Sequence, residues 1–500
     1  MFLHTIRAAA PFLLLLSTPL AAQSAQRIDA DDLMTHIRVL ASDQYQGRMP
    51  GTEGETLTTR YIVEQFRARG LEPAGTNGSW FQPVPLVERS EAQHVVNWSA
   101  NGRALPFGQD QIMLLGKDES ERIADAPVVF AGHGARMPER GIDQLAGANI
   151  RGAVVLILLE GPPVEGFPSL VERRQTLTDA GAAAVIAIIG SMPWERVKSV
   201  FAGQGTTQLA TSPVAEVTGM MPLSAAQSLL GAAGGDFSRL LNDQPGSSFR
   251  AVALPLRATI DVRTNVNRYV TNNVVGRIRG SGNTNESLLF LSHWDHLGIC
   301  RPEGIADRIC NGAVDNASGI ATMIEVAERL NAAPRPARDI LFLATTAEEK
   351  GLLGAEYFAA HPVVPAQSIV AAINMDTVAV HRAGLPVAMI GRGILPALAQ
   401  VVDSTVRAAG RQVDTDEEAN VMVQRQDGWK LNQAGIPTIM VGGSFSDMNV
   451  LGAFLQGHYH SPDDQAVGSI QLDGAVEDAN LMVDLARRLA DPTVYRRPRG

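Results

Sequence analysis

The chain has few of the residues on which several common classes of protein depend. Aromatic residues make up 5% of its 500 residues, and acidic residues outnumber basic ones by 52 to 42, which gives a formal net charge of −10. Because nucleic-acid binding requires a basic face and aromatic side chains that stack on bases, we expect no nucleic-acid partner. Beyond the N-terminus no apolar run is long enough to cross a bilayer, so we expect no integral membrane span.

The first two dozen residues have the pattern of a secretory signal. Arg7 precedes the apolar run 8–16, and small residues at 21–25 offer cleavage sites. The apolar run is too short for a bilayer-spanning helix. We therefore expect residues 1–24 to be a signal peptide and the protein to be exported, to the periplasm or the medium. The alternative is a buried first helix.

Cysteine is nearly absent from the chain. Its two cysteines, Cys300 and Cys310, bracket one short loop. In an oxidising compartment outside the cytoplasm, a disulfide between them is expected to close this loop. The alternative is a pair of thiolate metal ligands, but the other candidate ligands are carboxylates and imidazoles, which favour harder cations.

The length and the order of the patterns predict more than one domain. Strand and helix patterns alternate through 261–492, which predicts an α/β fold with a mostly parallel, mixed sheet flanked by helices. Residues 25–120 are expected to be the N-terminal part of the same domain. Short strands and alanine-rich helices in 121–260 predict an inserted module, and this region has no cluster of catalytic residue types. The tail, 493–500, is expected to be frayed and solvated.

Side chains that can bind metals follow the predicted strands. The apolar run 287–291 is followed by His293 and Asp295, which are two residues apart and can face the same side. Asp315 lies in a glycine-rich turn that opens a helix. Alone, His293 would be an ordinary strand-end histidine and Asp315 a helix cap. Ligands of α/β sheets bind beyond the carboxyl ends of the strands, so we expect these side chains to meet.

Two adjacent glutamates follow the next apolar run, 340–343. Glu348 and Glu349 point in different directions, so that one can bind a metal while the other moves protons. Two close carboxylates raise the pKa of one of them, which suits a general base near neutral pH. A solvated acidic turn is the alternative for this pair alone.

Two further candidates lie nearer the C-terminus. Asp376 follows an apolar strand, where a carboxylate is costly unless it is paired, caps a helix or binds a metal. His460 lies in a polar run, in which Tyr459 can donate to an oxyanion and Asp464 can orient the loop. His458 is expected to be an exposed neighbour, and a polar surface turn is the alternative for the whole run.

Together the candidates form a set of two imidazoles and three carboxylates, namely His293, Asp315, Glu349, Asp376 and His460. Such a set, with one carboxylate able to bridge, is typical of two divalent cations a few ångströms apart. Mixed nitrogen and oxygen ligands favour Zn²⁺, with Mn²⁺ or Co²⁺ as alternatives. Water activated by the metal could attack a carbonyl while Glu348 takes its proton and passes it to a leaving amine.

The order of these motifs resembles that of the aminopeptidase Y/S group of zinc peptidases, which is peptidase family M28. The blocks are His-x-Asp, Gly-x-x-Asp-Asn-x-x-Gly, Glu-Glu, Asn-Met-Asp and Tyr-His-Ser-Pro-x-Asp. The resemblance covers 264–490 well and 29–115 loosely. It implies a phosphorylase/hydrolase-like α/β fold and identifies the insert, 121–260, as similar to a protease-associated (PA) domain.

The resemblance also implies a role for each site residue. His293 and Asp376 would bind one zinc ion, Glu349 and His460 would bind the other, and Asp315 would bridge them. Glu348 would be the general base, and Asp295 would orient the imidazole of His293.

One loop departs from the family pattern. The family often has Arg-Ser-Asp-His-Tyr where this chain has Arg425-Gln-Asp-Gly-Trp429, so that glycine and tryptophan replace histidine and tyrosine. This loop usually lines the substrate pocket. We therefore expect Asp427 and Trp429, together with Tyr459, to contact the substrate, but the side-chain preference of relatives does not carry over.

The expected function is that of an exported, dinuclear zinc exopeptidase with peptide substrates, and in the first place an aminopeptidase. A carboxypeptidase of the glutamate-carboxypeptidase type is an alternative, because the motifs do not fix which end of the peptide is read. A glutaminyl cyclase-like aminoacyltransferase with one zinc is a second alternative. A non-catalytic, receptor-like protein is a third, but such relatives generally lose metal ligands, and this chain has kept the full set.

Overall fold

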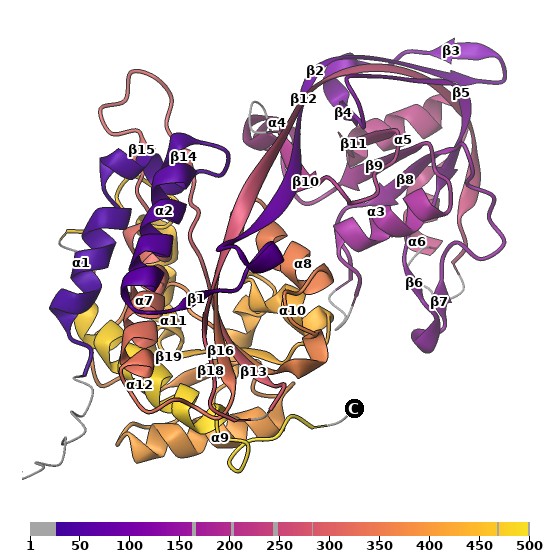
Figure 1. Cartoon of the computed structure of the whole chain (residues 1–500). Helices are drawn as coiled ribbons and strands as arrows, with labels where there is room; N and C mark the ends of the chain where they lie inside the picture. Colours follow the sequence, from indigo (N-terminus) through magenta and orange to yellow (C-terminus); the bar gives the residue numbers. More distant parts are fainter. Residues whose placement is uncertain are drawn as a thin grey trace, which may run out of the picture.

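The computed structural model describes residues 27–162, 167–201, 205–243, 249–282, 284–467 and 470–498. The expected signal peptide, 1–24, lies outside these ranges. Within them, 15 strands form one continuous hydrogen-bonded sheet that runs through two lobes (Figure 1). We call residues 27–80 and 273–498 the larger lobe and residues 91–263 the second lobe. No helix of the described ranges is long and apolar enough to cross a bilayer.

Two long antiparallel strands connect the lobes. Strands β2 (Phe81–Ala100) and β12 (Val252–Ile278) pair continuously, apart from one register shift beside Arg263. The sequence of β12 is rich in valine, threonine and isoleucine, and that of β2 in valine, and these residues favour extended backbone. One end of β12 lies in the sheet of the larger lobe, and the other end pairs with a strand of the second lobe (Figure 1).

Four parallel strands form the centre of the larger lobe: β13 (Ser287–His293), β16 (Asp339–Thr345), β17 (Ile369–Asn374) and β19 (Thr438–Gly442). Their order is β19-β17-β13-β16, and the antiparallel β18 (Ala388–Ile390) and β12 flank them. Every residue of β13, β17 and β19 is buried, as apolar strands of a parallel sheet covered on both faces should be. The predicted α/β class with a mostly parallel, mixed sheet is confirmed.

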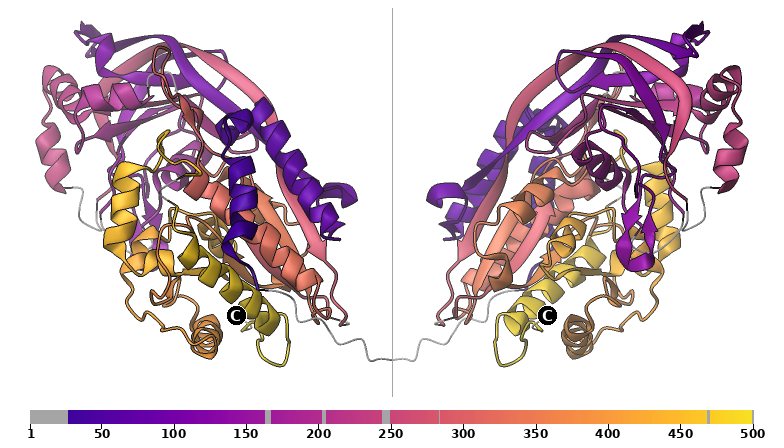
Figure 2. Two further views of the ribbon diagram at one scale, coloured as in Figure 1. Left: turned by 90° about the vertical axis from the view of Figure 1, so that its left-hand side faces the viewer. Right: turned by 90° about the vertical axis from the view of Figure 1, so that its right-hand side faces the viewer.

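Helices cover both faces of this sheet. One face packs against helices from both ends of the chain (Figures 1 and 2), namely α1 (Ala30–Leu40), α2 (Glu53–Ala68), α7 (Ser318–Asn331), α9 (Pro396–Ala408) and α12 (Leu472–Leu489). In this core the rings of Phe290 and Phe342 stack with centroids 5.6 Å apart. The opposite face packs against α8 (Leu353–Ala360) and α10 (Gly428–Gln433).

The second lobe has its own parallel strands. Strands β5 (Ser120–Phe130), β8 (Val154–Leu158), β9 (Ala184–Ile189) and β11 (Val217–Pro222) lie side by side, with α3 (Leu170–Asp179) and α5 (Leu223–Ala232) against them. The outermost strand, β4 (Met113–Gly116), precedes the expected boundary at residue 121 and pairs with β11. The sheet of the second lobe therefore includes residues before 121. These are β4 and the part of β2 that pairs with β12 in this lobe.

The predicted disulfide between Cys300 and Cys310 is present, with the two Cα atoms 5.7 Å apart. It joins the two short strands β14 (Gly298–Ile299) and β15 (Ile309–Cys310), which pair antiparallel. The cross-link therefore closes the base of the loop between His293 and Asp315.

The expectation of a frayed and solvated C-terminal tail is met only in part, because Thr493, Val494, Arg496 and Pro498 are exposed but two residues of the tail are held in place. Tyr495 is buried in the main core of the larger lobe. The Arg497 guanidinium donates to the carbonyls of Ala366 and Ile369, both at 3.0 Å. An aromatic ring that enters the core and a guanidinium that bonds backbone carbonyls hold this segment in place.

Candidate metal centre

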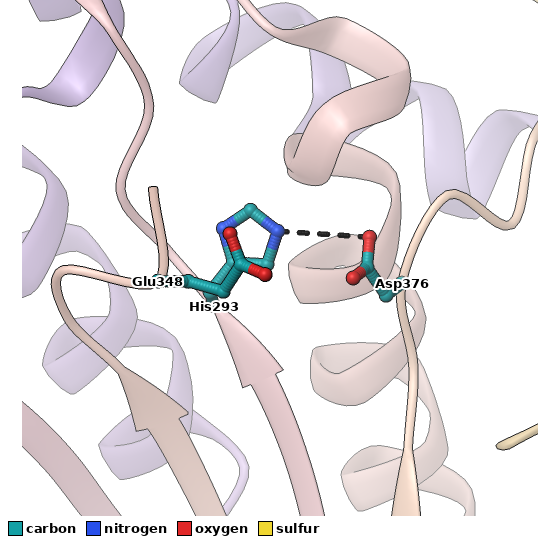
Figure 3. A group of neighbouring side chains, drawn as sticks. All are labelled: His293, Glu348 and Asp376. Carbon is teal, nitrogen blue, oxygen red and sulfur yellow. Dashed lines mark ion pairs between the residues drawn. The ribbon is translucent and has the colours of Figure 1, made fainter. Parts of the chain in front are cut away.

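Three neighbouring parallel strands present candidate ligands at one edge of the sheet. His293 is the last residue of β13, Glu348 and Glu349 follow β16, and Asp376 follows β17. Because β13 lies between β17 and β16, the carboxyl ends of the three strands meet. His293, Glu348 and Asp376 offer ligand atoms within 4.8 Å of one another, and Figure 3 shows their side chains converging.

Asp315 lies between the two imidazoles that the sequence singles out. Its Oδ1 is 3.2 Å from His293 Nε2, and its Oδ2 is 3.4 Å from His460 Nε2. Asp376 Oδ1 lies 3.6 Å from His293 Nε2, and Glu349 Oε2 lies 2.9 Å from His460 Nε2. One carboxylate thus faces two groups of ligands, with His293 and Asp376 on one side and Glu349 and His460 on the other.

In this cluster Asp315 Oδ2 and His460 Nε2 are both buried without a hydrogen-bond partner. Leaving a buried polar atom unsatisfied costs about 1–3 kcal/mol, and a cation bound between the two atoms would remove that cost. The donors are imidazole nitrogens and carboxylate oxygens, which is the chemistry that zinc accepts. The residues present therefore fit divalent cations.

The electrostatics of the cluster also favour a cation. Burial lowers the pKa of His460, but the nearby carboxylates of Asp315 and Glu349 outweigh burial and raise it to about 9. Burial raises the pKa of Asp315, but His293 and His460 outweigh it and hold that pKa well below its usual range. The cluster therefore gathers carboxylate charge in a buried place, where a bound cation is the natural counter-charge.

Glu348 offers a ligand atom beside His293 and Asp376, but the carboxylates that face the two imidazoles around Asp315 are those of Asp376 and Glu349. The side chain of Glu348 lines the cavity at the cluster. Burial raises the pKa of Glu348 well above its ordinary value, and the neighbouring Glu349 raises it further, whereas His293 lowers it. A carboxylate with a raised pKa that faces a cavity is suited to accept and return a proton.

Asp295 lies differently from what the family resemblance implies. His293 Nδ1 bonds the backbone carbonyl of Asp295 at 3.1 Å, while the nearest carboxylate oxygen of Asp295 is 3.8 Å away. That carboxylate instead accepts the backbone N–H groups of Glu348, at 3.1 Å, and Glu349, at 3.4 Å. The imidazole is therefore oriented by a backbone oxygen, and the Asp295 carboxylate holds the turn that carries the two glutamates.

Hydrogen bonds to three other parts of the chain hold the turn that carries Asp315. Asp464 accepts the backbone N–H of Val314 at 2.9 Å and that of Asp315 at 3.0 Å. The Asn316 amide donates to Ser292 Oγ at 3.0 Å and to the carbonyl of Met375 at 3.1 Å, at the ends of β13 and β17. The position of Asp315 is thus fixed relative to the strands that present the other ligands.

His296 is a site residue that the sequence analysis missed. Its Nδ1 lies 2.6 Å from Glu349 Oε1 and 3.8 Å from Asp315 Oδ2, and its buried Nε2 has no partner. His296, Asp315 and Glu349 offer ligand atoms within 4.8 Å of one another. The second histidine of His293-Trp-Asp-His296 is the signal that could have revealed it.

The cavity at the cluster has an acidic floor and an apolar wall. His293, Asp315, Glu348 and Asp376 form the floor, and the wall includes Met422, Met440, Phe445, Leu451, Leu455 and Tyr459. Tyr459 lies where the sequence places it, and its ring stacks on that of His460 with centroids 3.6 Å apart. His458 is exposed, as expected.

Two predicted substrate contacts do not lie in this cavity. Asp427 is 1% exposed and accepts a hydrogen bond from Thr345 Oγ1, because it directly precedes α10 and turns toward the end of β16. Burial raises its pKa to about 6, against the lowering effect of His293. Trp429, within α10, does not line the cavity either. Their neighbours Met422, Arg425 and Gln426 line it instead.

Comparison of the sequence with known proteins points to one family of peptidases. Residues 273–484 match the profile described as Peptidase family M28. A 97-residue segment is 34% identical to a vacuolar membrane protease of Clavispora lusitaniae, over 19% of this chain and 8% of that protein. A 203-residue segment is 28% identical to a glutamate carboxypeptidase 2 homolog of Caenorhabditis elegans, over 38% of this chain and 24% of that protein. The matched segments span less than a third of these curated relatives.

Comparison of the structure gives a similar fold over nearly the whole chain. An aminopeptidase from Aneurinibacillus sp. strain AM-1 superposes with a TM-score of 0.52 and 17% identity, over 95% of this chain and 98% of that chain. At this identity the likeness concerns the fold, which is the α/β architecture described above.

Proposed function

Residues 273–484 belong to peptidase family M28, and we propose that the chain is a dinuclear zinc exopeptidase, in the first place an aminopeptidase that hydrolyses the N-terminal bond of peptides. One observation carries the proposal. The two oxygens of Asp315 face two separate groups of ligands, while Glu348 lines the same cavity beside His293 and Asp376. This is the arrangement that a pair of cations and a separate base require.

Each side of Asp315 would hold one ion. His293 and Asp376 would hold the first zinc ion, and Glu349 and His460 would hold the second. When bound, the zinc pair supplies Lewis acidity, which activates water and polarises a carbonyl group. Manganese or cobalt would suit the same donors.

The chain's own side chains would move the protons. Glu348 would accept a proton from the attacking water and deliver it to the leaving amine, which its raised pKa allows. Asp295 keeps Glu348 in place by accepting its backbone N–H. Tyr459, on the wall of the cavity, would donate its O–H to the oxygen of the tetrahedral intermediate.

The residues that line the cavity favour binding of the amino-terminal end of a peptide substrate. Glu348, which lines the cavity and is not assigned to a zinc ion, would attract the α-ammonium group of a peptide. The wall residues Met440, Phe445 and Leu451 would bury an apolar side chain of the first residue. We therefore expect peptides with a free amino terminus and an apolar first residue to be the better substrates.

A carboxypeptidase is the second candidate, and one residue favours it. Arg425 is exposed and lines the cavity, so its guanidinium could bind a C-terminal carboxylate. A kinetic screen separates the two: aminoacyl amides with a free amine are aminopeptidase substrates, and N-blocked dipeptides are carboxypeptidase substrates. A Gln-initial peptide tests the aminoacyltransferase, which would release a cyclised product. Each assay is repeated with a chelator, and activity that survives metal removal would contradict all three.

The proposed role of Glu348 is tested by Glu348→Gln. This change keeps the size of the side chain and removes the base, so the zinc content should stay near that of the wild type while kcat falls about 10²- to 10⁴-fold. Zinc per chain and kcat are measured on the same preparation. Normal turnover in this variant would remove Glu348 from the mechanism.

We also propose that the protein is exported and that residues 121–260 correspond to a PA-like module. The Cys300–Cys310 disulfide supports an oxidising compartment. Fractionation of cells that produce the full chain, compared with a variant lacking residues 1–24, tests the export. Equal distribution of the two would contradict it.

A further inference from the structure

Arg48 is a fully buried arginine whose guanidinium bonds only backbone carbonyls. It is 1% exposed. Its Nε donates to Trp294 O at 2.9 Å, one terminal nitrogen donates to Leu40 O at 2.8 Å and Asn311 O at 2.6 Å, and the other donates to Gly312 O at 2.8 Å. Burial lowers its pKa to about 10, so the side chain stays charged at neutral pH.

Apart from that of Leu40, the bonded carbonyls lie at the two ends of the long loop between His293 and Asp315, and we call these ends the loop of His293 and the loop of Asp315. Trp294 directly follows His293, and Gly312 lies three residues before Asp315. The backbone carbonyl of Arg48 also accepts the N–H of His296 at 3.4 Å, and His296 in turn bonds Glu349. A single residue therefore connects the two loops with each other and, through Leu40, with the end of α1.

The short helical segment that carries Arg48, Asp43–Arg48, fits tightly between these loops. A Cβ atom at Gly47 would lie 2.4 Å from the carbonyl oxygen of Cys310 and 2.8 Å from Gly298 Cα, so only glycine fits there. Asp43 accepts a hydrogen bond of 2.8 Å from the Asn311 amide. This segment lies outside residues 273–484, which match the peptidase family.

We propose that Arg48 is a positioning residue of the zinc centre. Its three hydrogen bonds to Trp294, Asn311 and Gly312 set the distance between the loop of His293 and the loop of Asp315, and its backbone carbonyl supports Glu349 through His296. A guanidinium is suited to this role because it presents five N–H donors in a planar fork. A lysine has three donors at one point and cannot hold both loops. The inference rests on the proposed binding of zinc.

The charge of Arg48 and the geometry of its hydrogen bonds should have opposite effects on zinc affinity. A positive charge near two divalent cations repels them, whereas a correct spacing of the ligands strengthens their binding. Arg48→Lys keeps the charge and loses the fork, and Arg48→Met loses both. If the geometry decides, both variants bind zinc more weakly than the wild type. If the charge decides, Arg48→Met binds zinc more tightly.

The zinc affinity of the full chain is measured by competition with a chromophoric chelator, and Tm is measured with and without zinc. We expect both Arg48 variants to bind zinc about 10- to 100-fold more weakly, as is typical when a residue that supports a ligand is removed. Their zinc-dependent rise in Tm should shrink accordingly. Arg48 has φ 53°, and both replacements carry a Cβ, so the backbone strain is the same in all three proteins.

Arg338 provides the matched control. It is also fully buried, and it donates to Leu489 O at 2.7 Å and to Glu286 Oε2 at 2.8 Å, before the start of β16 and so at the opposite end of the strand from the ligands. Arg338→Lys and Arg338→Met should lower the Tm of the metal-free protein but leave zinc affinity unchanged. The lysine pair alone suffices if a methionine variant does not fold.

Two outcomes would overturn the inference. Wild-type zinc affinity in Arg48→Lys would show that the fork is not needed, and an equal loss of affinity in the Arg338 variants would show a general effect of destabilisation. A wild-type protein that binds no zinc would instead refute the proposed function, so the two failures are distinguishable.

Discussion

The two lobes are both built from parallel strands and helices, but they differ in the residues that lie just beyond the strand ends. In the larger lobe β13, β16 and β17 lead into imidazoles and carboxylates. In the second lobe β5 and β8 are followed by His133 and Glu160, but neither side chain belongs to a group of three possible metal ligands. Within the described parts of the chain, both groups of possible metal ligands lie in the larger lobe. The strand arrangement alone does not make a site, because the residues beyond the strand ends decide it.

A second comparison concerns buried arginines. In the second lobe Arg173 donates to the carbonyls of His133, Leu158, Leu159 and Pro168, at 2.9, 2.8, 2.6 and 3.1 Å. This is the same bonding pattern as that of Arg48, but these carbonyls belong to loops without ligands. The same device therefore serves stability in one lobe and, as we propose, metal binding in the other.

The largest effect is expected from removing one of the candidate metal ligands, which among the described residues are grouped only in the larger lobe. Asp315→Asn removes the charge that both groups of ligands share, so zinc affinity should fall by more than about 100-fold, beyond the range for a supporting residue. Zinc per chain after dialysis measures this. Glu160→Gln, at the end of a second-lobe strand, is the control and should retain the wild-type zinc content. An Asp315→Asn protein with two firmly bound ions would contradict the proposed centre.

The contrast between the arginines predicts the next effect. Arg173→Met leaves several buried carbonyls without donors, so the free energy of unfolding should fall by about 3–5 kcal/mol. Urea denaturation measures it. Because Arg173 contacts no ligand loop, the folded variant should bind zinc as the wild type does. A loss of zinc affinity would show that the lobes are coupled at the metal centre.

The disulfide offers a smaller perturbation within the larger lobe. It closes a loop with a sequence separation of 10, and replacing both Cys300 and Cys310 by serine should lower the free energy of unfolding by about 2–3 kcal/mol through the entropy of the unfolded chain. The wild type in a reducing agent should unfold at the same urea concentration as the double variant. A difference between the two would point to an effect of the serines themselves.

The smallest expected effect is a pH dependence in the second lobe. Burial lowers the pKa of His133 to about 4, and the charge of Arg173 lowers it further, relative to about 6.5 in the unfolded chain. Protons thus bind the unfolded state more readily, so this contribution to stability is complete above pH 6.5 and is lost as the pH falls toward 4. Urea midpoints at pH 7 and pH 4.5 should differ more in the wild type than in His133→Gln. Equal differences would contradict this assignment.

The sequence predicts the elements of the larger lobe well because these elements depend on local patterns. The apolar runs 287–291, 340–343 and 369–375 become β13, β16 and β17, since buried parallel strands are apolar on both faces. The full length of strands β2 and β12 is not predictable in the same way. Their alternation of polar and apolar residues indicates a strand, but not that it passes from one lobe into the other.

The sequence likewise predicts only part of the candidate site. Residue types and their order predict which side chains meet, since strand ends gather at one edge of a sheet. They do not predict which atoms of a residue are used. The backbone carbonyl of Asp295, rather than its carboxylate, contacts the His293 imidazole, and Asp427 turns inward to Thr345. The bond between His296 and Glu349 likewise depends on loop conformation, which spacing does not encode.

The continuous pairing of β2 with β12 limits how this protein can be engineered. A cassette of residues 121–260 would lack all of β2 and the last 18 residues of β12, so excising or transplanting it would expose unpaired backbone on both resulting fragments. Such open strands invite aggregation. Variants of either lobe are therefore best made in the uncut chain.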